Sequence, residues 1–384
     1  MVKVPCYLTP DPNAKDSLMN ILFLTTHLNV GGITSYLLTL TKGLIKQGHG
    51  VFLASSSGEM LEAFQSLGVE HLKLNISTKS ELDPRIYLAL GRLRRFIKQK
   101  DIHVVHTQTR VTQVMGFCLG RITEIPYLST CHGFFKTRLS RKIFPCWGEC
   151  VIAISEAVRD HLLKDFRVDP KRCVLIKNGI DSDDFLAIDE DTRRKNRQRF
   201  HLEHNRVIGI IARLSDVKGH DILIKAMGKV IQQFPDARLL IVGEGPRKEP
   251  LQRMVKELNL NEHVQFYPIV NHTAEMLSLL DVFVLPSFEE GLGLSVMEAQ
   301  AAGLSVVASK VGGLPQLIDD GRTGLLVHPK NADLLSEAIL FLLRNPQKAR
   351  QMGKEAQEFI QKEFSAQRMV NETLALYKQF IGRR

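Results

Sequence analysis

The sequence predicts an α/β protein built from two Rossmann-like domains, each a doubly wound parallel sheet, that face a cleft. Three observations support this prediction. Short apolar runs alternate with amphipathic stretches along the chain, which is typical of parallel sheets covered by helices on both faces. The alternation forms two series, separated by a polar and charged stretch at residues 181–199. The length of 384 residues, of which 44% are hydrophobic, is sufficient for two domains.

The first series defines an N-terminal domain at residues 1–185. Its apolar runs are short, as expected of buried parallel strands. The expected strands are residues 21–25, 51–54, 71–74, 104–107, 127–130, 151–154 and 174–176. Amphipathic patterns between them predict helices that include residues 34–47, 83–100 and 156–165. Ser155 precedes the third of these helices as a plausible N-cap.

The second series defines a C-terminal domain at residues 186–364. The expected strands are residues 207–212, 238–242, 264–266, 282–285, 305–308 and 324–327. The expected helices are residues 220–234, 247–258, 274–280, 294–302 and 332–343. A last amphipathic stretch, at about residues 365–384, predicts a C-terminal helix.

Bulk features narrow the class of protein. No run approaches the roughly 18 apolar residues of a membrane-spanning helix. The first twenty residues lack an apolar core, so we expect no signal peptide there. The six cysteines include no Cys-x-x-Cys pair, and no His-x-x-x-His pattern accompanies them. We therefore expect reduced thiols in a cytoplasmic protein without a metal site.

The positive charge is confined to the first half of the chain. Residues 1–180 hold 24 Lys and Arg against 14 Asp and Glu, a net charge of +10, whereas residues 181–384 hold 27 of each. Basic residues mix with aromatic ones at residues 91–100 and 134–147, and the second stretch contains a cationic patch. Its members are Lys136, Arg138, Arg141 and Lys142. We expect contact with an anionic membrane surface or an anionic acceptor, a solvated face being the alternative. Nucleic acid is not expected, since no recognised binding module is present.

Two acids flank a glycine-rich loop in the second domain. Glu290 stands immediately before Gly291, and Gly293 precedes a helix expected to begin near Leu294. Glu298 follows within the first turns of that helix. Either acid alone is explained by a solvated helix start, where carboxylates suit the macrodipole. Together with the glycines and two flanking strands, they favour a site for a polyhydroxylated, phosphorylated ligand.

Cations and further glycines lie where parallel strands end. Arg213 follows an expected strand directly, at the carboxyl edge where open α/β sheets bind ligands. Lys218 precedes a helix start, which is unfavourable for a cation unless an anion lies nearby. The alternative is two loop cations in solvent. Gly31 and Gly32 open the first helix and offer backbone N–H groups to a phosphate or to an acceptor.

These motifs resemble those of the retaining, nucleotide-sugar-dependent glycosyltransferases of family 4, which have the GT-B fold. The resemblance runs from about Asn20 to the C-terminal helix. By its Glu-x7-Glu signature, Glu290 would lie against the donor sugar and Glu298 would bind the ribose hydroxyls. His132, in a His-Gly element, would lie beside the donor sugar and position it, and the pair Gly31-Gly32 would contact the donor diphosphate or the acceptor.

The resemblance also implies roles for the remaining site residues. Arg213 and Lys218 would bind the donor diphosphate and take part in catalysis with Glu290 and His132. The donor would further be lined by Gly291, Leu292, Gly293 and Leu294. The turn Asn178–Asp181 would be an interdomain hinge, and the C-terminal helix would pack back on the first domain. Pro268 stands where the family usually has a glycine near the base.

The implied function is a metal-independent hexosyltransferase that needs no cofactor. It would build a cell-envelope glycan or glycolipid, such as lipopolysaccharide, at the cytoplasmic face of the membrane, with a UDP-sugar favoured over a GDP-sugar as donor. A GT-B nucleotide-sugar epimerase or hydrolase and a non-catalytic nucleotide-sugar-binding protein are the alternatives. The sequence leaves the sugar, the acceptor, the linkage and the oligomeric state open.

Overall fold

The structure, a computed structural model, describes residues 18–186, 188–270 and 273–381. Most of the first twenty residues, for which we expect no signal peptide, lie outside this description. The chain divides into two compact units. Unit 1 contains the described residues up to Gly179 together with those from Ala366 onwards, and unit 2 spans Ile180–Ser365. The first crossing between the units thus comes a few residues before the expected boundary at residue 185.

Unit 1 is built on a seven-stranded parallel sheet with the order β3-β2-β1-β4-β5-β6-β7. Its strands are β1 (Asn20–Leu24), β2 (Gly50–Ser55), β3 (Glu70–Lys73), β4 (Val104–Thr107), β5 (Tyr127–Cys131), β6 (Val151–Ala153) and β7 (Cys173–Leu175). Its helices are α1 (Gly32–Lys46), α2 (Leu61–Gln65), α3 (Pro84–Gln99), α4 (Arg110–Thr123), α5 (Leu139–Ile143), α6 (Glu156–Asp165) and α15 (Ala366–Ile381). The strand order reverses between β1 and β4, which is where ligands bind in such sheets.

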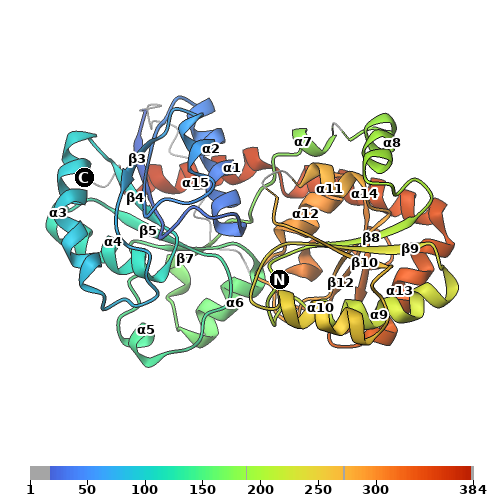
Figure 1. The fold of residues 1–384 in the computed structure, drawn as a ribbon. Coiled ribbons are helices and arrows are strands. Elements are labelled where there is room, and N and C mark those ends of the chain that lie inside the picture. Colours follow the sequence, from blue (N-terminus) through green and yellow to red (C-terminus); the bar gives the residue numbers. More distant parts are fainter. Residues whose placement is uncertain (1–17, 187, 271–272, 382–384) are drawn as a thin grey trace. The chain divides into compact units, whose positions relative to one another are not determined.

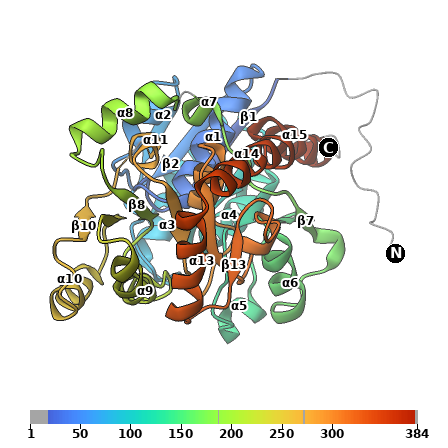
Figure 2. The ribbon, with the colours of Figure 1, turned by 90° about the vertical axis from the view of Figure 1, so that its right-hand side faces the viewer.

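Unit 2 is built on a six-stranded parallel sheet with the order β10-β9-β8-β11-β12-β13. Its strands are β8 (Arg206–Ile211), β9 (Ala237–Val242), β10 (Val264–Tyr267), β11 (Val282–Leu285), β12 (Ser305–Ser309) and β13 (Leu325–Val327). Its helices are α7 (Asp183–Leu186), α8 (Glu190–Arg199), α9 (His220–Gln233), α10 (Lys248–Glu257), α11 (Ala274–Ser278), α12 (Leu294–Ala301), α13 (Ala332–Arg344) and α14 (Pro346–Glu363). Here the order reverses between β8 and β11, and α9 packs beside α13 (Figure 2).

The expected fold class is confirmed, because all thirteen expected strands are present and pair in parallel within two doubly wound sheets. The strand interiors are buried apolar residues, such as Ile21, Phe23 and Val207, each with no exposed surface. None of the described helices combines the length and hydrophobicity that crossing a membrane requires.

The C-terminal helix α15 belongs to unit 1, where it packs against α1 (Figure 1). Met369, Val370 and Tyr377 of α15 are buried in the same apolar cluster as residues of α1 and β1. The chain enters and leaves unit 2 at one place, since Ile180 donates its N–H to the Phe364 carbonyl at 2.8 Å. The stretch that resembles the family's hinge therefore lies at the crossing.

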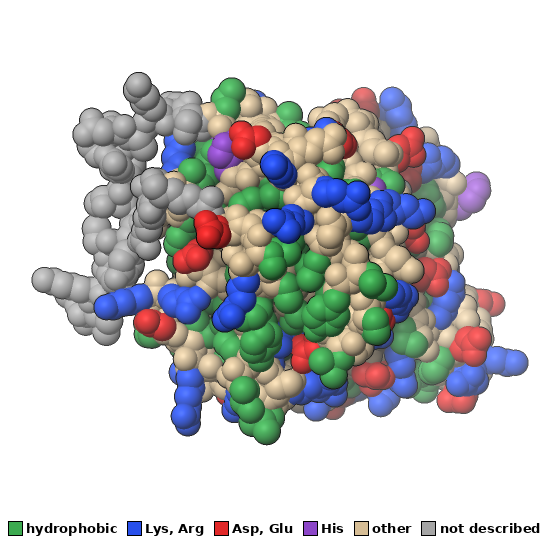
Figure 3. Space-filling view, turned by 90° about the vertical axis from the view of Figure 1, so that its left-hand side faces the viewer, with side chains coloured by type: hydrophobic (Ala, Val, Ile, Leu, Met, Phe, Trp, Pro, Cys, Tyr) green, Lys and Arg blue, Asp and Glu red, His purple; other side chains and the backbone are tan. Residues whose placement is uncertain are grey.

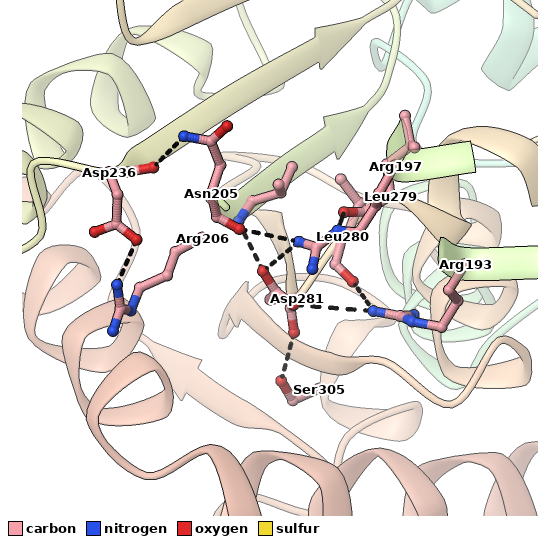
Figure 4. A network of polar contacts seen from close by, with 10 residues as sticks. Arg193, Arg197, Asn205, Arg206, Asp236, Leu279, Leu280, Asp281 and Ser305 are labelled. Carbon is pink, nitrogen blue, oxygen red and sulfur yellow. Dashed lines mark hydrogen bonds and ion pairs between the residues drawn. The ribbon is translucent and has the colours of Figure 1, made fainter. Parts of the chain in front are cut away.

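The charged stretch expected to separate the domains is not a solvated linker. It contains α8, which packs against α11 in unit 2. Arg197 donates to the Asp281 carboxylate at 2.7 Å, and Arg193 donates to the Leu280 carbonyl at 2.6 Å (Figure 4). Asp281 also accepts from the N–H of Val207 at 2.8 Å, so one acid ties α8 to the start of β8. About half of the charged stretch 181–199 is thus a helix packed on unit 2.

Candidate active site

Arg213 lies at the carboxyl end of β8 in unit 2, in a segment held by the next loop along the sheet. Gly243 and Gly245 approach so closely that an added Cβ would meet the carbonyl oxygens of Ala212 and Leu214 at 2.1 and 2.2 Å. The fixed segment leaves the side chain of Arg213 exposed. Among the described residues, none gives its guanidinium a hydrogen bond or an ion pair. The backbone of Arg213 is therefore held in place, and its guanidinium is available to an anion.

Lys218 and Glu290, which the sequence indicates independently, meet in the structure. The Lys218 ammonium lies 2.5 Å from Oε2 of Glu290, and both side chains are mostly buried. Gly219 makes the meeting possible because it has a φ of 69° and a Cβ there would lie 2.0 Å from the Pro286 carbonyl oxygen. The loop after β8 thus packs on the loop after β11, its neighbour in the sheet.

A third loop, which sequence reasoning missed, supports the same carboxylate. Gly312 and Gly313 follow β12 and pack on the backbone of Glu290, where an added Cβ on Gly312 would lie 1.8 Å from the Glu290 carbonyl oxygen. That carbonyl accepts the N–H of Gly313 at 3.1 Å. The Glu290 carboxylate also receives the Ser287 hydroxyl at 3.3 Å. The sequence signal that could have indicated this loop is a Gly-Gly pair a few residues after an expected strand.

Glu298 lies on α12, and its surroundings differ from those of Glu290. Its carboxylate accepts the Thr273 hydroxyl at 3.0 Å. Burial raises the pKa of Glu298 to about 7, although the Thr273 hydrogen bond acts in the opposite direction. Glu290 is therefore paired with a lysine, whereas Glu298 is buried and ionises near neutral pH.

The residues between the two acids form the start of α12 at the expected position. Gly293 is the N-cap with a φ of 106°, and the first turn of the helix holds no acid and no side-chain cap. Its N–H groups thus face the site without a built-in anion. Leu292 is buried, so only its backbone can meet a ligand, whereas Gly291 and Leu294 are partly exposed.

In unit 1, His132 lies just beyond β5 and is positioned by two other residues. Its Nε2 is 2.8 Å from the side-chain oxygen of Gln108, which follows β4. Its ring also packs edge-on against Tyr36 of α1, with centroids 4.9 Å apart. Burial lowers the pKa of His132 to about 3, so the imidazole is neutral at neutral pH. Gln108 was missed by sequence reasoning, although it directly follows an expected strand.

The glycine pair at the start of α1 is exposed and lies after β1. Gly31 is the N-cap, and the helix has no side-chain cap and no acid in its first turn. An added Cβ on Gly31 would meet nothing within 4 Å. Gly31 therefore borders open space, which leaves room for an anion or an acceptor at the start of α1.

A buried polar network behind His132 was also missed. Nδ1 of His106 is 2.7 Å from the hydroxyl of Tyr377 on α15, and its Nε2 is 2.7 Å from the hydroxyl of Thr130. Tyr36 joins through a 3.3 Å contact with Thr130. Burial lowers the pKa of His106 to about 3, which keeps the ring neutral. The network fastens the C-terminal helix to the sheet of unit 1.

The predicted cationic patch needs a correction. Arg141 is buried, and its guanidinium lies 3.9 Å from the ring centroid of Phe135. Burial lowers the pKa of Arg141 to about 10. Arg141 therefore holds its own loop together through a cation–π contact and is no part of the surface. Lys136, Arg138 and Lys142 are exposed.

Comparison with known proteins identifies the family. Residues 30–184 match Glycosyltransferase Family 4, and residues 191–359 match Glycosyl transferases group 1. A D-inositol 3-phosphate glycosyltransferase from Corynebacterium aurimucosum is 26% identical over 370 residues, which cover 87% of each chain. A GDP-mannose-dependent alpha-(1-6)-phosphatidylinositol monomannoside mannosyltransferase from Mycolicibacterium smegmatis is 39% identical over 186 residues, 46% of this chain and 48% of that one.

Solved structures agree on the fold. The crystal structure of Anabaena Alr3699/HepE in complex with UDP and glucose superimposes with a TM-score of 0.84, at 20% identity, over 94% of this chain and all of that one. The first family match lies on unit 1 and the second on unit 2. The candidate site residues within them, such as His132, Arg213 and Glu290, follow strands at the carboxyl edges of the two sheets. The chain belongs to the group 1, family 4 glycosyltransferases and has their GT-B fold.

Proposed function

We propose that the protein is a retaining glycosyltransferase that moves a hexose from a nucleotide-sugar to a hydroxyl of a cell-envelope glycan or glycolipid. The observation that carries the proposal is the meeting of Lys218 and Glu290 at the ends of two neighbouring strands. Arg213 belongs to the same loop after β8 as Lys218 and has no charged partner among the described residues. Such a site offers two cations to a diphosphate and a fixed carboxylate to sugar hydroxyls.

The chemistry follows from where charge develops. Cleavage of the donor's glycosidic bond leaves additional negative charge on the nucleoside diphosphate, which Arg213 and Lys218 stabilise without a metal ion. Glu290, held by Lys218 and Ser287, accepts hydrogen bonds from the sugar and fixes its orientation. The leaving phosphate accepts the proton of the incoming hydroxyl, so the new bond forms on the face that the diphosphate leaves. His132, neutral at neutral pH, positions the sugar and does not act as the main base.

The donor and acceptor classes are part of the same proposal. One relative is named for GDP-mannose and a phosphatidylinositol mannoside, and one similar structure contains UDP. Both support a nucleotide-sugar donor, and the first supports a lipid-linked acceptor. We take UDP-sugars as the first candidates for the donor and a lipopolysaccharide-like glycolipid as the acceptor. With such an acceptor, we expect the protein to act at a cytoplasmic membrane face.

A donor screen tests the proposal. Purified protein is incubated with UDP- and GDP-sugars, with and without membrane lipid extract, and released nucleotide is measured with and without EDTA. We expect one donor to release nucleoside diphosphate, faster with acceptor and undiminished by EDTA, and the anomeric coupling in the product to match that of the donor. An inverted product or EDTA-sensitive turnover overturns the mechanism. A new sugar nucleotide would indicate an epimerase, and binding without turnover a non-catalytic protein.

A further inference from the structure

One face of unit 1, formed by α3, α4 and α5, has an unusual charge composition. These three helices contain no Asp or Glu at all. Residues 84–147 as a whole hold twelve Lys and Arg against two Asp and Glu. The two acids that precede α3 are each neutralised, Glu81 by Arg110 and Asp83 by Arg85. This α3–α5 face therefore presents positive charge with almost no negative charge to balance it.

The same face exposes large apolar side chains. Leu82, in the loop before α3, and Leu88 of α3 are 79% and 78% exposed. Leu139 and Ile143 of α5 are 71% and 73% exposed. Figure 3 shows hydrophobic side chains gathered on this side of unit 1, with Lys and Arg around them. Side chains exposed to this extent gain nothing from folding, and a cluster of them marks a contact surface.

The two apolar groups belong to one continuous surface. Arg110, the first residue of α4, pairs with Glu81 beside Leu82 and also donates to the carbonyl oxygens of Phe144 and Pro145, each at 2.7 Å. The loop before α3 is thus joined to the loop after α5. The ring of Phe144 also packs on Phe117 of α4, with centroids 4.6 Å apart. All three helices share the contact.

Exposed cations flank the apolar side chains. Arg92 lies one turn beyond Leu88 on α3, followed by Arg95 and Lys98, and Lys142 lies between Leu139 and Ile143 on α5. Apolar side chains that enter a lipid interface, surrounded by cations that meet anionic head groups, are the composition of a peripheral membrane surface. We propose that the α3–α5 face docks on an anionic lipid bilayer, with Leu82, Leu139 and Ile143 entering the head-group region.

Docking there would bring the lipid to the active edge of unit 1. The start of α4 follows β4, and α5 follows β5, so Arg110 and α5 lie at the carboxyl edge of the sheet. His132 and the pair Gly31-Gly32 lie at that same edge. A lipid-linked acceptor in the docked bilayer would therefore present its head group where sugar transfer occurs. This purpose rests on the proposed function, whereas the docking itself does not.

Vesicle binding tests the docking. The full chain is sedimented with vesicles of phosphatidylcholine containing about 30% phosphatidylglycerol, and with pure phosphatidylcholine. We expect binding to the anionic vesicles that weakens with salt. Arg92→Gln/Arg95→Gln/Lys142→Gln should lower the partition coefficient by on the order of 100-fold, at about fivefold per cation. Leu139→Ser/Ile143→Ser should lower it by at least about tenfold, even at high salt.

Matched controls make the outcome specific. The variant Lys225→Gln/Arg350→Gln/Lys354→Gln removes three exposed cations from unit 2 and should bind vesicles like the parent. If the face variants also bind like the parent, the docking is overturned. It is equally overturned if Leu139→Ser/Ile143→Ser converts a dimer to a monomer in sedimentation velocity while vesicle binding is unchanged, because the face would then join two copies.

Nucleotide titration of each variant separates the two proposals. Variants of the α3–α5 face should bind nucleoside diphosphate with the parent's affinity, because the site residues of unit 2 are unchanged. Loss of vesicle binding with intact nucleotide binding supports the docking alone. A parent that binds vesicles but no nucleotide would refute the proposed function and leave the docking standing.

Discussion

Replacing Glu298 with Gln should make the protein more stable and its nucleotide binding weaker, for one physical reason. In the folded chain the pKa of Glu298 is raised from 4.5 to about 7 by burial. Ionising it there costs about 3 kcal/mol, at about 1.4 kcal/mol for each pH unit between the two values. The folded state keeps the proton between these two values, so stability is lost as pH rises through this window. Above pH 7 the whole penalty is present.

Glu298→Gln never ionises and avoids the penalty. At about pH 8 the variant should be more stable than the parent by about 3 kcal/mol, or roughly 6–12 °C in melting temperature, and near pH 4.5 the two should agree. Glu337→Gln, at an exposed position on α13, is the matched control and should follow the parent at every pH. Scanning calorimetry from about pH 5 to about pH 8 measures the difference.

The same proton should appear in nucleotide binding. A carboxylate that accepts two ribose hydroxyls must be ionised, so binding at pH 7 should release about half a proton, and affinity should fall as pH drops below 7. Glu298→Gln should remove this pH dependence and weaken binding by roughly 1.5–3 kcal/mol at pH 8. Calorimetric titration with UDP and GDP in buffers of different ionisation enthalpy measures the proton directly. The reasoning is refuted if the melting temperatures of the parent, Glu298→Gln and Glu337→Gln change with pH in the same way and nucleotide binding releases no proton.

Three further predictions address other parts of the molecule. Arg213→Ala and Lys218→Ala should each lower kcat by about 100-fold or more, with a smaller change in KM. The control Arg253→Ala, at an exposed position on α10, should leave kcat unchanged. Equal effects of all three variants would mean that Arg213 and Lys218 take no part in catalysis. Gly312→Ala should lower the free energy of unfolding in urea by at least about 2 kcal/mol and weaken donor binding, because the added Cβ would overlap the Glu290 carbonyl oxygen at 1.8 Å. The control Gly228→Ala, whose added Cβ would meet nothing within 4 Å, should not lower the free energy of unfolding. Tyr377→Phe should lower the free energy of unfolding by about 1–3 kcal/mol, because Nδ1 of the buried His106 would lose its partner. The control Tyr87→Phe, at the surface, should change it little. Equal unfolding midpoints for the two variants would mean that the His106–Tyr377 hydrogen bond does not hold α15 in place.

The elements that the sequence predicted well are those whose signals are local. The buried strand at β11 is a run of four apolar residues closed by Pro286, and α12 begins at Leu294 because Gly293 adopts the positive φ of its N-cap. The carboxyl-edge positions of Arg213 and His132 follow in turn, because a residue after a parallel strand lies at that edge in any register. Family resemblance then linked these positions to a known chemistry.

The pairings across the sequence required the tertiary structure. Lys218 and Glu290 are 72 residues apart, and only the neighbouring positions of β8 and β11 bring them to 2.5 Å. The sequence also did not show which charged residues are buried, because a charged residue has the same sequence signature whether it is solvated or packed. Arg141 was expected on the surface and lies over an aromatic ring, and the charged α8 is tied to Asp281. Local periodicity determines which elements form, and the packing between them determines which polar groups meet.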